Sequence, residues 1–185
     1  MKKALLFFLF SLILFSLCAC SQPEIESSTG APISTEAAPI TDELFEKPPK
    51  LRILSGNNSF DTTSGTSSWS YHVKEDQWCS LEMDCDHPLN IPEHTEAILL
   101  SDGRVSLSFE LPPDSFKISY WPMETRESEE FLNYEYPDST ILAENQEDVT
   151  LRDGTWIYEV EAVWNADAQR NCYGNARYSF WATVE

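Results

Sequence analysis

The chain has 185 residues, of which 31 are acidic and 12 basic, giving a formal net charge of −19 at pH 7. Binding to phosphate depends on Lys and Arg displacing counterions, so this charge excludes nucleic acid as a partner and disfavours anionic headgroups. It favours cationic partners or divalent cations, although a negative surface also keeps an exported protein soluble.

The first twenty residues have the pattern of an export signal. Lys2 and Lys3 precede an uncharged apolar run at 4–17, which is shorter than the roughly 17–25 residues of a membrane-spanning helix. The stretch LCAC at 17–20 follows and resembles the lipobox of bacterial lipoproteins. This resemblance implies that a signal peptide at 1–19 is removed and that Cys20 becomes the lipidated N-terminus. An ordinary signal peptide or an uncleaved anchor is the alternative.

A lipid on Cys20 would determine where the protein resides. Each buried methylene of an acyl chain contributes ~0.8 kcal/mol, so two or more chains hold a protein on a bilayer where one does not. We therefore expect a lipid anchor in the cell membrane, with the protein on the extracytoplasmic face, where disulfides are permitted.

Residues 20–47 follow as a linker rich in Ser, Thr, Pro, Ala and Glu. Phe45 is its one aromatic residue, so the segment has too little apolar surface to offset its ordering entropy. We predict a disordered stalk and place the start of the folded domain at residue 48, where Pro48 and Pro49 mark the boundary.

Residues 48–185 alternate apolar and polar side chains with the period of half-buried strands. Asp-Gly, Pro-Pro and Ser-Asp-Gly turns separate these runs. The strongest strand predictions are 104–111, 115–121, 156–164 and 176–184, and weaker ones are 50–56, 66–72, 78–83, 96–101 and 148–151. An acidic insertion at 122–147 contains the one helical possibility, 124–133. The pattern predicts a single all-β sandwich with antiparallel strands.

The stretch LRDGTWIYEVEAVW at 151–164 resembles the penultimate strand of immunoglobulin-like sandwiches, where an Asp-Gly turn precedes an aromatic-rich strand. The paired cysteines of antibody domains are missing. Together with GTSSWSY (65–71), HPL (87–89) and ARYSF (176–180), the stretch is similar to an uncharacterised sandwich domain in surface lipoproteins of Gram-positive bacteria. That domain also resembles an extracytoplasmic part of relatives of β-lactam-sensing membrane metallopeptidases. The resemblance implies an immunoglobulin-like fold and a surface location, and it contains no catalytic motif.

No enzyme motif is present. The sequence lacks GxSxG, HExxH, a P-loop and GxGxxG, and none of its three histidines lies beside a nucleophile in a recognised context. Carboxylates are too abundant for any pair to be assigned as acid and base. We expect neither catalytic activity nor a cofactor.

The stretch WCSLEMDCDHP at 78–88 concentrates cysteine, histidine and carboxylates. After loss of Cys18 and lipidation of Cys20, the remaining thiols are Cys79, Cys85 and Cys172, so pairing would leave one over. Cys79–Cys85 is the candidate disulfide. A bridge from either to Cys172, in a turn before the last strand, is the alternative, and all three can remain free.

A metal site in this stretch has little support from the spacing. Zinc or copper would need Cys79, Cys85, His87 and Cys172, but five residues separate the first two cysteines, against two to four in typical zinc pairs. Calcium would prefer Asp76, Glu82, Asp84 and Asp86, whose spacing matches no EF-hand. We predict a short strand running into an acidic turn, with no metal.

The outward faces of three predicted strands provide a candidate binding face. Alternation places Trp121, Ile157, Val163 and Trp181 opposite the core side of the sheet. Exposed aromatic side chains ringed by charge are typical of protein or carbohydrate recognition. The alternative is that the acidic insertion folds over this face and buries it.

These features together predict a non-catalytic binding or accessory module, anchored to the cell membrane and facing outward. The alternatives are a cell-envelope enzyme that uses carboxylates or calcium, and an extracellular ligand-sensor domain. The expected partners are the membrane, through Cys20, and a protein or carbohydrate at the cell surface.

Overall fold

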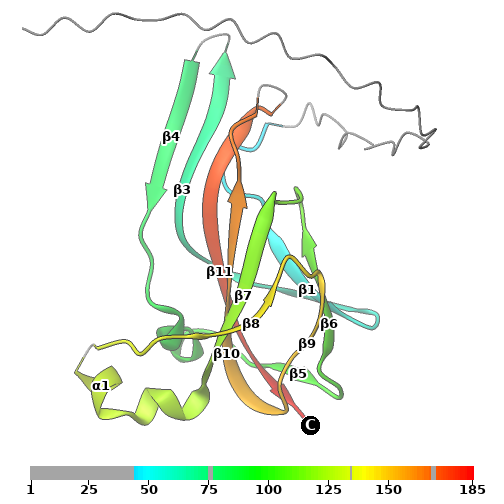
Figure 1. Cartoon of the computed structure of the whole chain (residues 1–185), viewed down its shortest axis with the longest axis vertical. Helices are drawn as coiled ribbons and strands as arrows, with labels where there is room; N and C mark the ends of the chain where they lie inside the picture. Colours follow the sequence, from blue (N-terminus) through cyan, green and yellow to red (C-terminus); the bar gives the residue numbers. More distant parts are fainter. Residues whose placement is uncertain (1–43, 75–76, 134, 168–169) are drawn as a thin grey trace, which may run out of the picture. The chain divides into compact units, whose positions relative to one another are not determined.

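The computed structural model describes residues 44–74, 77–133, 135–167 and 170–185, which form a sandwich of two β-sheets (Figure 1). The predicted signal peptide, Cys20 and most of the predicted linker lie outside the described residues. No helix in the described part of the chain is long and apolar enough to cross a membrane.

The smaller sheet has four strands. In spatial order they are β2 (Asn58–Asp61), β1 (Leu51–Ser55), β6 (Arg104–Phe109) and β9 (Asp148–Thr150), all antiparallel to their neighbours.

The larger sheet has seven strands. Six follow the order β4 (Gln77–Met83), β3 (Thr63–Lys74), β11 (Cys172–Val184), β10 (Gly154–Trp164), β7 (Ser115–Pro122) and β8 (Thr140–Glu144), each antiparallel to the next. The seventh, β5 (Ile98–Leu100), pairs in parallel with the C-terminal end of β11. Three short helices complete the fold: the 3₁₀ helices η1 (Pro88–Glu93) and η2 (Met123–Glu127) and the α-helix α1 (Glu129–Leu132).

The predicted all-β sandwich is confirmed, and each predicted strand forms within a few residues of its expected bounds. Two strands were not predicted. β2 is only four residues long, and the apolar residues of β8, Ile141 to Ala143, are consecutive rather than alternating. The helical prediction for 124–133 corresponds to η2 and α1.

The strand pairing fits the predicted immunoglobulin-like arrangement. In that fold strands A, B and E share one sheet and strands C, F and G share the other. Here β1, β6 and β9 match the first set, β7, β10 and β11 match the second, and β8 lies where a C′ strand would. Near the start of β10, the Tyr158 hydroxyl accepts a hydrogen bond from the Arg152 N–H at 3.0 Å, as in a tyrosine corner. The hairpin of β3 and β4 is an addition beside β11.

The core lies between the sheets and follows the predicted alternation. Tyr158, Val160, Ala162 and Trp164 of β10 are fully or almost fully buried. Across the core, Trp69 and Trp164 meet edge to face, with ring centroids 5.3 Å apart. Such close packing fixes the register of both strands, because a shift by one residue would turn every buried side chain outward.

The domain begins earlier than the sequence predicts. Phe45 is buried in the main core, and its carbonyl oxygen accepts a hydrogen bond from Trp69 Nε1 at 2.9 Å. Pro49 is also fully buried, and its carbonyl oxygen accepts from the Tyr178 hydroxyl. The predicted boundary at residue 48 is therefore too late. A lone aromatic residue in a polar segment has no local pattern that would predict its entry into the core.

Replacing Phe45 by alanine in the full chain should lower the free energy of unfolding by about 3–5 kcal/mol, since it removes a buried aromatic ring and leaves a cavity. Urea denaturation followed by tryptophan fluorescence measures the change. Leu44→Ala is the matched control, because Leu44 is exposed and should change the free energy by about 0.5 kcal/mol or less. Equal effects of the two substitutions would contradict the placement of Phe45 in the core.

Candidate binding surface

The predicted binding face exists as a row of side chains but is covered. Ile157 of β10 lies between Trp121 of β7 and Trp181 of β11 in the strand register. Ile157 is fully buried, Trp121 is almost so, and Trp181 is half-buried. The prediction of an exposed aromatic face is therefore wrong for this row, although the alternation that placed the three side chains together is confirmed.

The cover comes from two segments. Leu89 of η1 is fully buried against Trp121 and Ile157, and Met123 of η2 and Phe131 of α1 pack on the same cluster. The indole groups are also bonded to the cover. Trp121 Nε1 donates to the Pro137 carbonyl oxygen at 2.9 Å, and Trp181 Nε1 donates to Thr95 Oγ1 at 3.1 Å. The acidic insertion folds over this face and buries it, which was the alternative to an exposed binding face. The helix η1 also covers the face, and this helix was not predicted.

Val163 lies farther along β10, away from the tryptophans. Two rows of charged and polar side chains separate it from Ile157, and it lines a shallow pocket with Lys117, Glu144 and Glu161. The structure therefore does not join Val163 to the other three predicted residues in one surface.

The charged rows are the nearest approach to a pair of catalytic carboxylates. Burial raises the pKa of Glu159, whose nearest described cation is Arg177 at 3.7 Å. Burial also acts on Glu161, but its ion pairs with Lys117 at 2.7 Å and Arg177 at 3.2 Å outweigh it and lower its pKa. Carboxylates with separated pKa values are a feature of acid–base sites. Here Glu161 is occupied by its ion pairs, and the side chain of Glu159 is only 12% exposed.

His87 fixes the cover to the sheet. Its ring stacks on Tyr136 of the insertion, with centroids 4.0 Å apart, and meets Trp121 edge-on at 5.4 Å. Its Nδ1 accepts a hydrogen bond from the Leu89 N–H at the start of η1. Burial lowers the pKa of His87 below its ordinary value of 6.5, and the positive charge of Arg177 lowers it further. The sequence showed only a histidine before a proline, so this role was missed.

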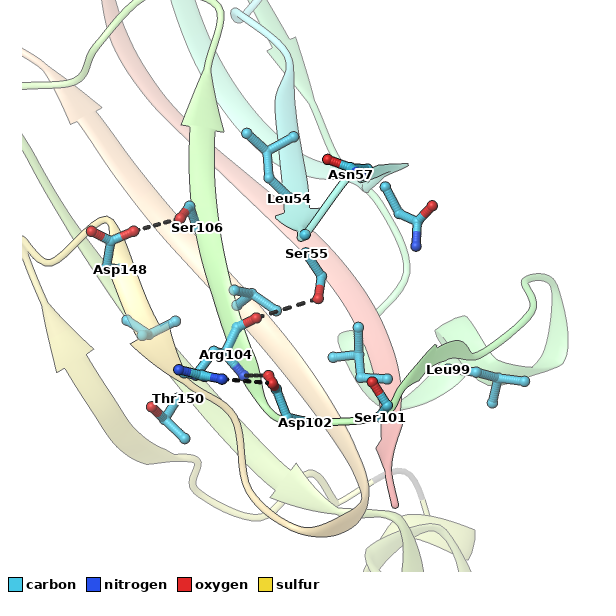
Figure 2. Close-up of a pocket in the computed structure, with 15 residues that line it drawn as sticks. Leu54, Ser55, Asn57, Leu99, Ser101, Asp102, Arg104, Ser106, Asp148 and Thr150 are labelled. Atoms are coloured by element: carbon cyan, nitrogen blue, oxygen red, sulfur yellow. Dashed lines mark hydrogen bonds and ion pairs between the residues drawn. The ribbon is translucent and has the colours of Figure 1, made fainter.

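A polar groove of about 900 Å³ opens along β6 and the turns beside it (Figure 2). Its two carboxylates each have a partner within the groove. Asp102 pairs with Arg104 at 3.0 Å, which lowers the pKa of Asp102, and Asp148 accepts a hydrogen bond from Ser106. Figure 2 shows both carboxylates directed toward these partners rather than toward each other. The groove therefore lacks a free acid–base pair.

Exposed apolar side chains gather on the hairpin of β3 and β4. The exposed fractions lie between 40% and 49% for four side chains: Val73, Trp78, Leu81 and Met83. Leu81 and Met83 lie opposite Trp69 and Ser67 in the register, so they face the same side as the core. In Figure 1, β4 is on the side of the larger sheet away from β6 and β9, so the smaller sheet does not cover it. Trp78 lies opposite His72 in the register, so it is on the other face of the hairpin. We call these four residues, which occupy both faces of the hairpin, the hairpin surface.

The tryptophan of the hairpin surface is part of a small aromatic cluster. The Trp78 ring lies 5.2 Å from His72 on β3 and 5.2 Å from Tyr173 on β11, measured between centroids. These contacts hold an exposed indole in one place, which is the arrangement that protein interfaces use for aromatic anchors. The sequence WCSLEM contained a signal for this surface. Its strand has Trp78 on one face and Leu81 and Met83 on the other, whereas a strand with one buried face has polar residues on the exposed face.

The cysteines do not pair. All three of Cys79, Cys85 and Cys172 are free thiols, and the candidate Cys79–Cys85 disulfide is contradicted. Cys79 lies opposite Tyr71 on β3, whereas the Cys85 N–H donates to the Thr66 hydroxyl at 3.4 Å, five residues farther along the same strand. Five residues of extended strand span about 16 Å. A disulfide needs Cα atoms within about 7 Å.

A bridge from Cys172 to Cys79 is also excluded. Tyr71 of β3 lies between them in the register, so they are two strand spacings, about 10 Å, apart. Cys172 lies in β11 rather than in a turn, and its burial raises the pKa of its thiol. Gly174 also lies within β11, where a Cβ atom would collide with the Ser68 carbonyl oxygen, so close strand approach requires glycine there.

The short strand and acidic connection predicted for 78–88 are present, because β4 ends at Met83 and residues 84–87 lead into η1. Within the described residues, no three His, Cys, Asp or Glu side chains lie close enough together to hold a metal ion. Asp76, one of the calcium candidates, lies outside these residues.

Comparisons with models of protein families, with curated proteins and with solved structures gave no match. The function must therefore be inferred from the sequence and the structure of the chain itself.

Replacing Trp121 by alanine should lower the free energy of unfolding by about 3–5 kcal/mol, because the indole fills the cluster under η1 and the insertion. Replacing the half-exposed Trp78 should cost about 1 kcal/mol or less. Chemical denaturation of both variants measures the difference. A Trp121 variant as stable as the wild type would contradict the placement of Trp121 in a buried cluster with Leu89 and Ile157.

Protonation of His87 should loosen the cover. The fold favours the neutral ring, so its contribution to stability is complete above pH 6.5 and is lost as the pH falls toward the lowered pKa of the folded state. The stability advantage of the wild type over His87→Asn should therefore be smaller at pH 5 than at pH 7.5. Urea denaturation at both pH values tests this, with the exposed His94→Asn as control. An advantage that does not change with pH would refute the role given to His87.

Proposed function

We propose that this protein is an extracytoplasmic lipoprotein, held in the cell membrane by a lipid on Cys20, that acts as a non-catalytic binding module. The proposal combines the lipobox pattern at 17–20 with the hairpin surface. The observation that carries it is the exposed Trp78, held by His72 and Tyr173 on one face of a hairpin that the second sheet leaves uncovered, with Leu81 and Met83 exposed on the opposite face.

Several features of the sandwich support binding over other roles for this surface. The indole of Trp78 is fixed by ring contacts, so docking a partner would order few further groups. Leu81 and Met83 are exposed two residues apart on one face of β4, and neighbouring exposed apolar side chains often mark an interaction site. A stalk between the lipid and the domain, as the composition of 20–47 predicts, would leave the hairpin accessible above the membrane.

The principal alternative is a carboxylate-dependent envelope enzyme, which the separated pKa values of Glu159 and Glu161 favour. It is less well supported, because the ion pairs of Glu161 would have to open before a substrate reached either group. A ligand-sensor role rests on family resemblance alone.

Cell fractionation combined with cross-linking tests the proposal. The full chain expressed in a Gram-positive host should be found in the membrane fraction, with a diacylglyceryl group on Cys20 by mass spectrometry. Cys20→Ser should lose the lipid and, if still exported, should appear in the medium. Cys18→Ser should behave as the wild type, since that residue is removed with the signal.

The same cells test binding. An amine-reactive cross-linker on intact cells should yield an adduct with the wild type that Trp78→Ser loses and Ile141→Ser retains. Ile141 is the matched control because it is an exposed apolar residue on β8, at the opposite edge of the same sheet. Retention of the adduct by Trp78→Ser would place binding elsewhere. An unmodified Cys20 in the wild type would remove the anchor.

A further inference from the structure

The larger sheet ends at β4, which pairs with β3 and with no other described strand. The direction of its free backbone groups follows from the ladder. The His72 N–H donates to the Asn171 carbonyl oxygen at 2.8 Å, so His72 bonds toward β11. Successive residues of a strand alternate in direction, so Tyr71 and Trp69 bond toward β4.

Their partners on β4 are Cys79 and Leu81, which therefore use their backbone groups on β3. The residues between and beside them, Trp78, Ser80 and Glu82, direct their N–H and C=O groups away from the sheet. The edge thus offers a row of donors and acceptors spaced for another strand.

The other edges of the two sheets are less suited to pairing. β2 has four residues and β9 has three, and the pairing of β8 with β7 contains a register shift. β4 has seven residues, of which the six from Trp78 to Met83 pair in unbroken register, and it contains no Pro, Lys or Arg. Those residues and irregularities are what proteins use to prevent strand addition. The one irregularity in the pairing of β4, between His72 and Lys74 of β3, lies at the Gln77 end and leaves Trp78–Met83 without such protection.

The charge around β4 indicates what would pair with it. Residues 82–86 contain three acidic side chains, Glu82, Asp84 and Asp86, and no Lys or Arg, whereas Lys74 of β3 lies opposite Gln77 at the other end of β4. Glu82 lies on the strand itself. Among the contacts described, its carboxylate accepts one hydrogen bond, from the uncharged Ser68 hydroxyl at 3.1 Å. A basic strand would complement this charge, whereas a second copy would repel it. The chain's own linker is likewise disfavoured as the added strand, because residues 21–43 contain acidic side chains and no Lys or Arg.

We propose that β4 is the docking edge for an extended, basic segment of a protein partner, which adds to the larger sheet as a further strand. This proposal rests on the proposed binding function and names its partner. Main-chain hydrogen bonds to Trp78, Ser80 and Glu82 provide affinity, as in other cases of strand addition. Alternate side chains of the segment contact Trp78 on one face and Leu81 and Met83 on the other, and a Lys or Arg lies near Glu82.

A synthetic peptide of about ten residues that alternates valine with lysine is the probe, a length sufficient to span the strand. Its fluorescently labelled form is titrated with the full chain in detergent, and anisotropy gives the affinity. Two control peptides are used, one with glutamate in place of lysine and one with N-methylated amides. Both should bind at least about tenfold more weakly, because one reverses the charge and the other cannot pair with the edge.

On the protein, Ser80→Pro removes the outward N–H of Ser80 without removing a bond to β3, and it should weaken binding at least about tenfold. Ser80→Ala removes the same hydroxyl but keeps the N–H, so it separates the two effects. Glu82→Gln should weaken binding of the lysine peptide and make its affinity less dependent on salt. Thermal denaturation shows whether each variant remains folded, and the N-methylated peptide tests the edge on the unaltered chain.

Equal binding of the N-methylated peptide would overturn strand addition, and equal binding of the glutamate peptide would overturn the basic preference. If sedimentation shows a dimer that Ser80→Pro dissociates, the occupant is a second copy and the basic partner is wrong. If the lysine peptide fails to bind while Trp78→Ser still loses the adduct on cells, strand addition falls and the binding function stands. Loss of both results removes both proposals.

Discussion

The ladder between β10 and β11 is the constraint on which the rest of the structure depends. It pairs all 11 residues of β10, from Gly154 to Trp164, with consecutive residues of β11. Near its start, β10 has apolar side chains on both faces, Tyr158 toward the second sheet and Ile157 away from it. Both faces must therefore be covered. The smaller sheet covers one, and η1 with the insertion covers the other, which explains why an acidic segment folds back onto a sheet.

This double cover also decides where binding is possible. Trp121 and Trp181, on either side of Ile157, pack against the cover and are not free to bind a partner. His87 joins the cover to the sheet through ring contacts with Tyr136 and Trp121. The β3–β4 hairpin extends the larger sheet beyond both covers, so its apolar side chains and the edge of β4 remain accessible. The same addition to the sandwich thus leaves apolar side chains exposed and a strand edge unprotected, two features that suit the proposed strand addition.

Charge gives the surface its selectivity. The acidic excess of the chain continues through β4 and the segment after it, and none of the ion pairs among the described residues involves Glu82, Asp84 or Asp86. Acidic groups near the hairpin therefore remain available to a basic partner, whereas Glu161 is already neutralised by Lys117 and Arg177. Long-range attraction of this kind raises the rate of encounter more than the final affinity.

The sequence alone determined the all-β class, the positions of the main strands and the side of each strand that enters the core, because alternation is a local consequence of strand geometry. It also determined the acidic surface. Only the tertiary structure decided which outward faces stay exposed. Trp121 and Trp78 read alike in sequence, yet one is buried under η1 and the other projects from an edge. The entry of Phe45 into the core and the separation of Cys79 from Cys85 were decided in the same way. Burial of an outward face depends on distant segments, and no local pattern contains that information.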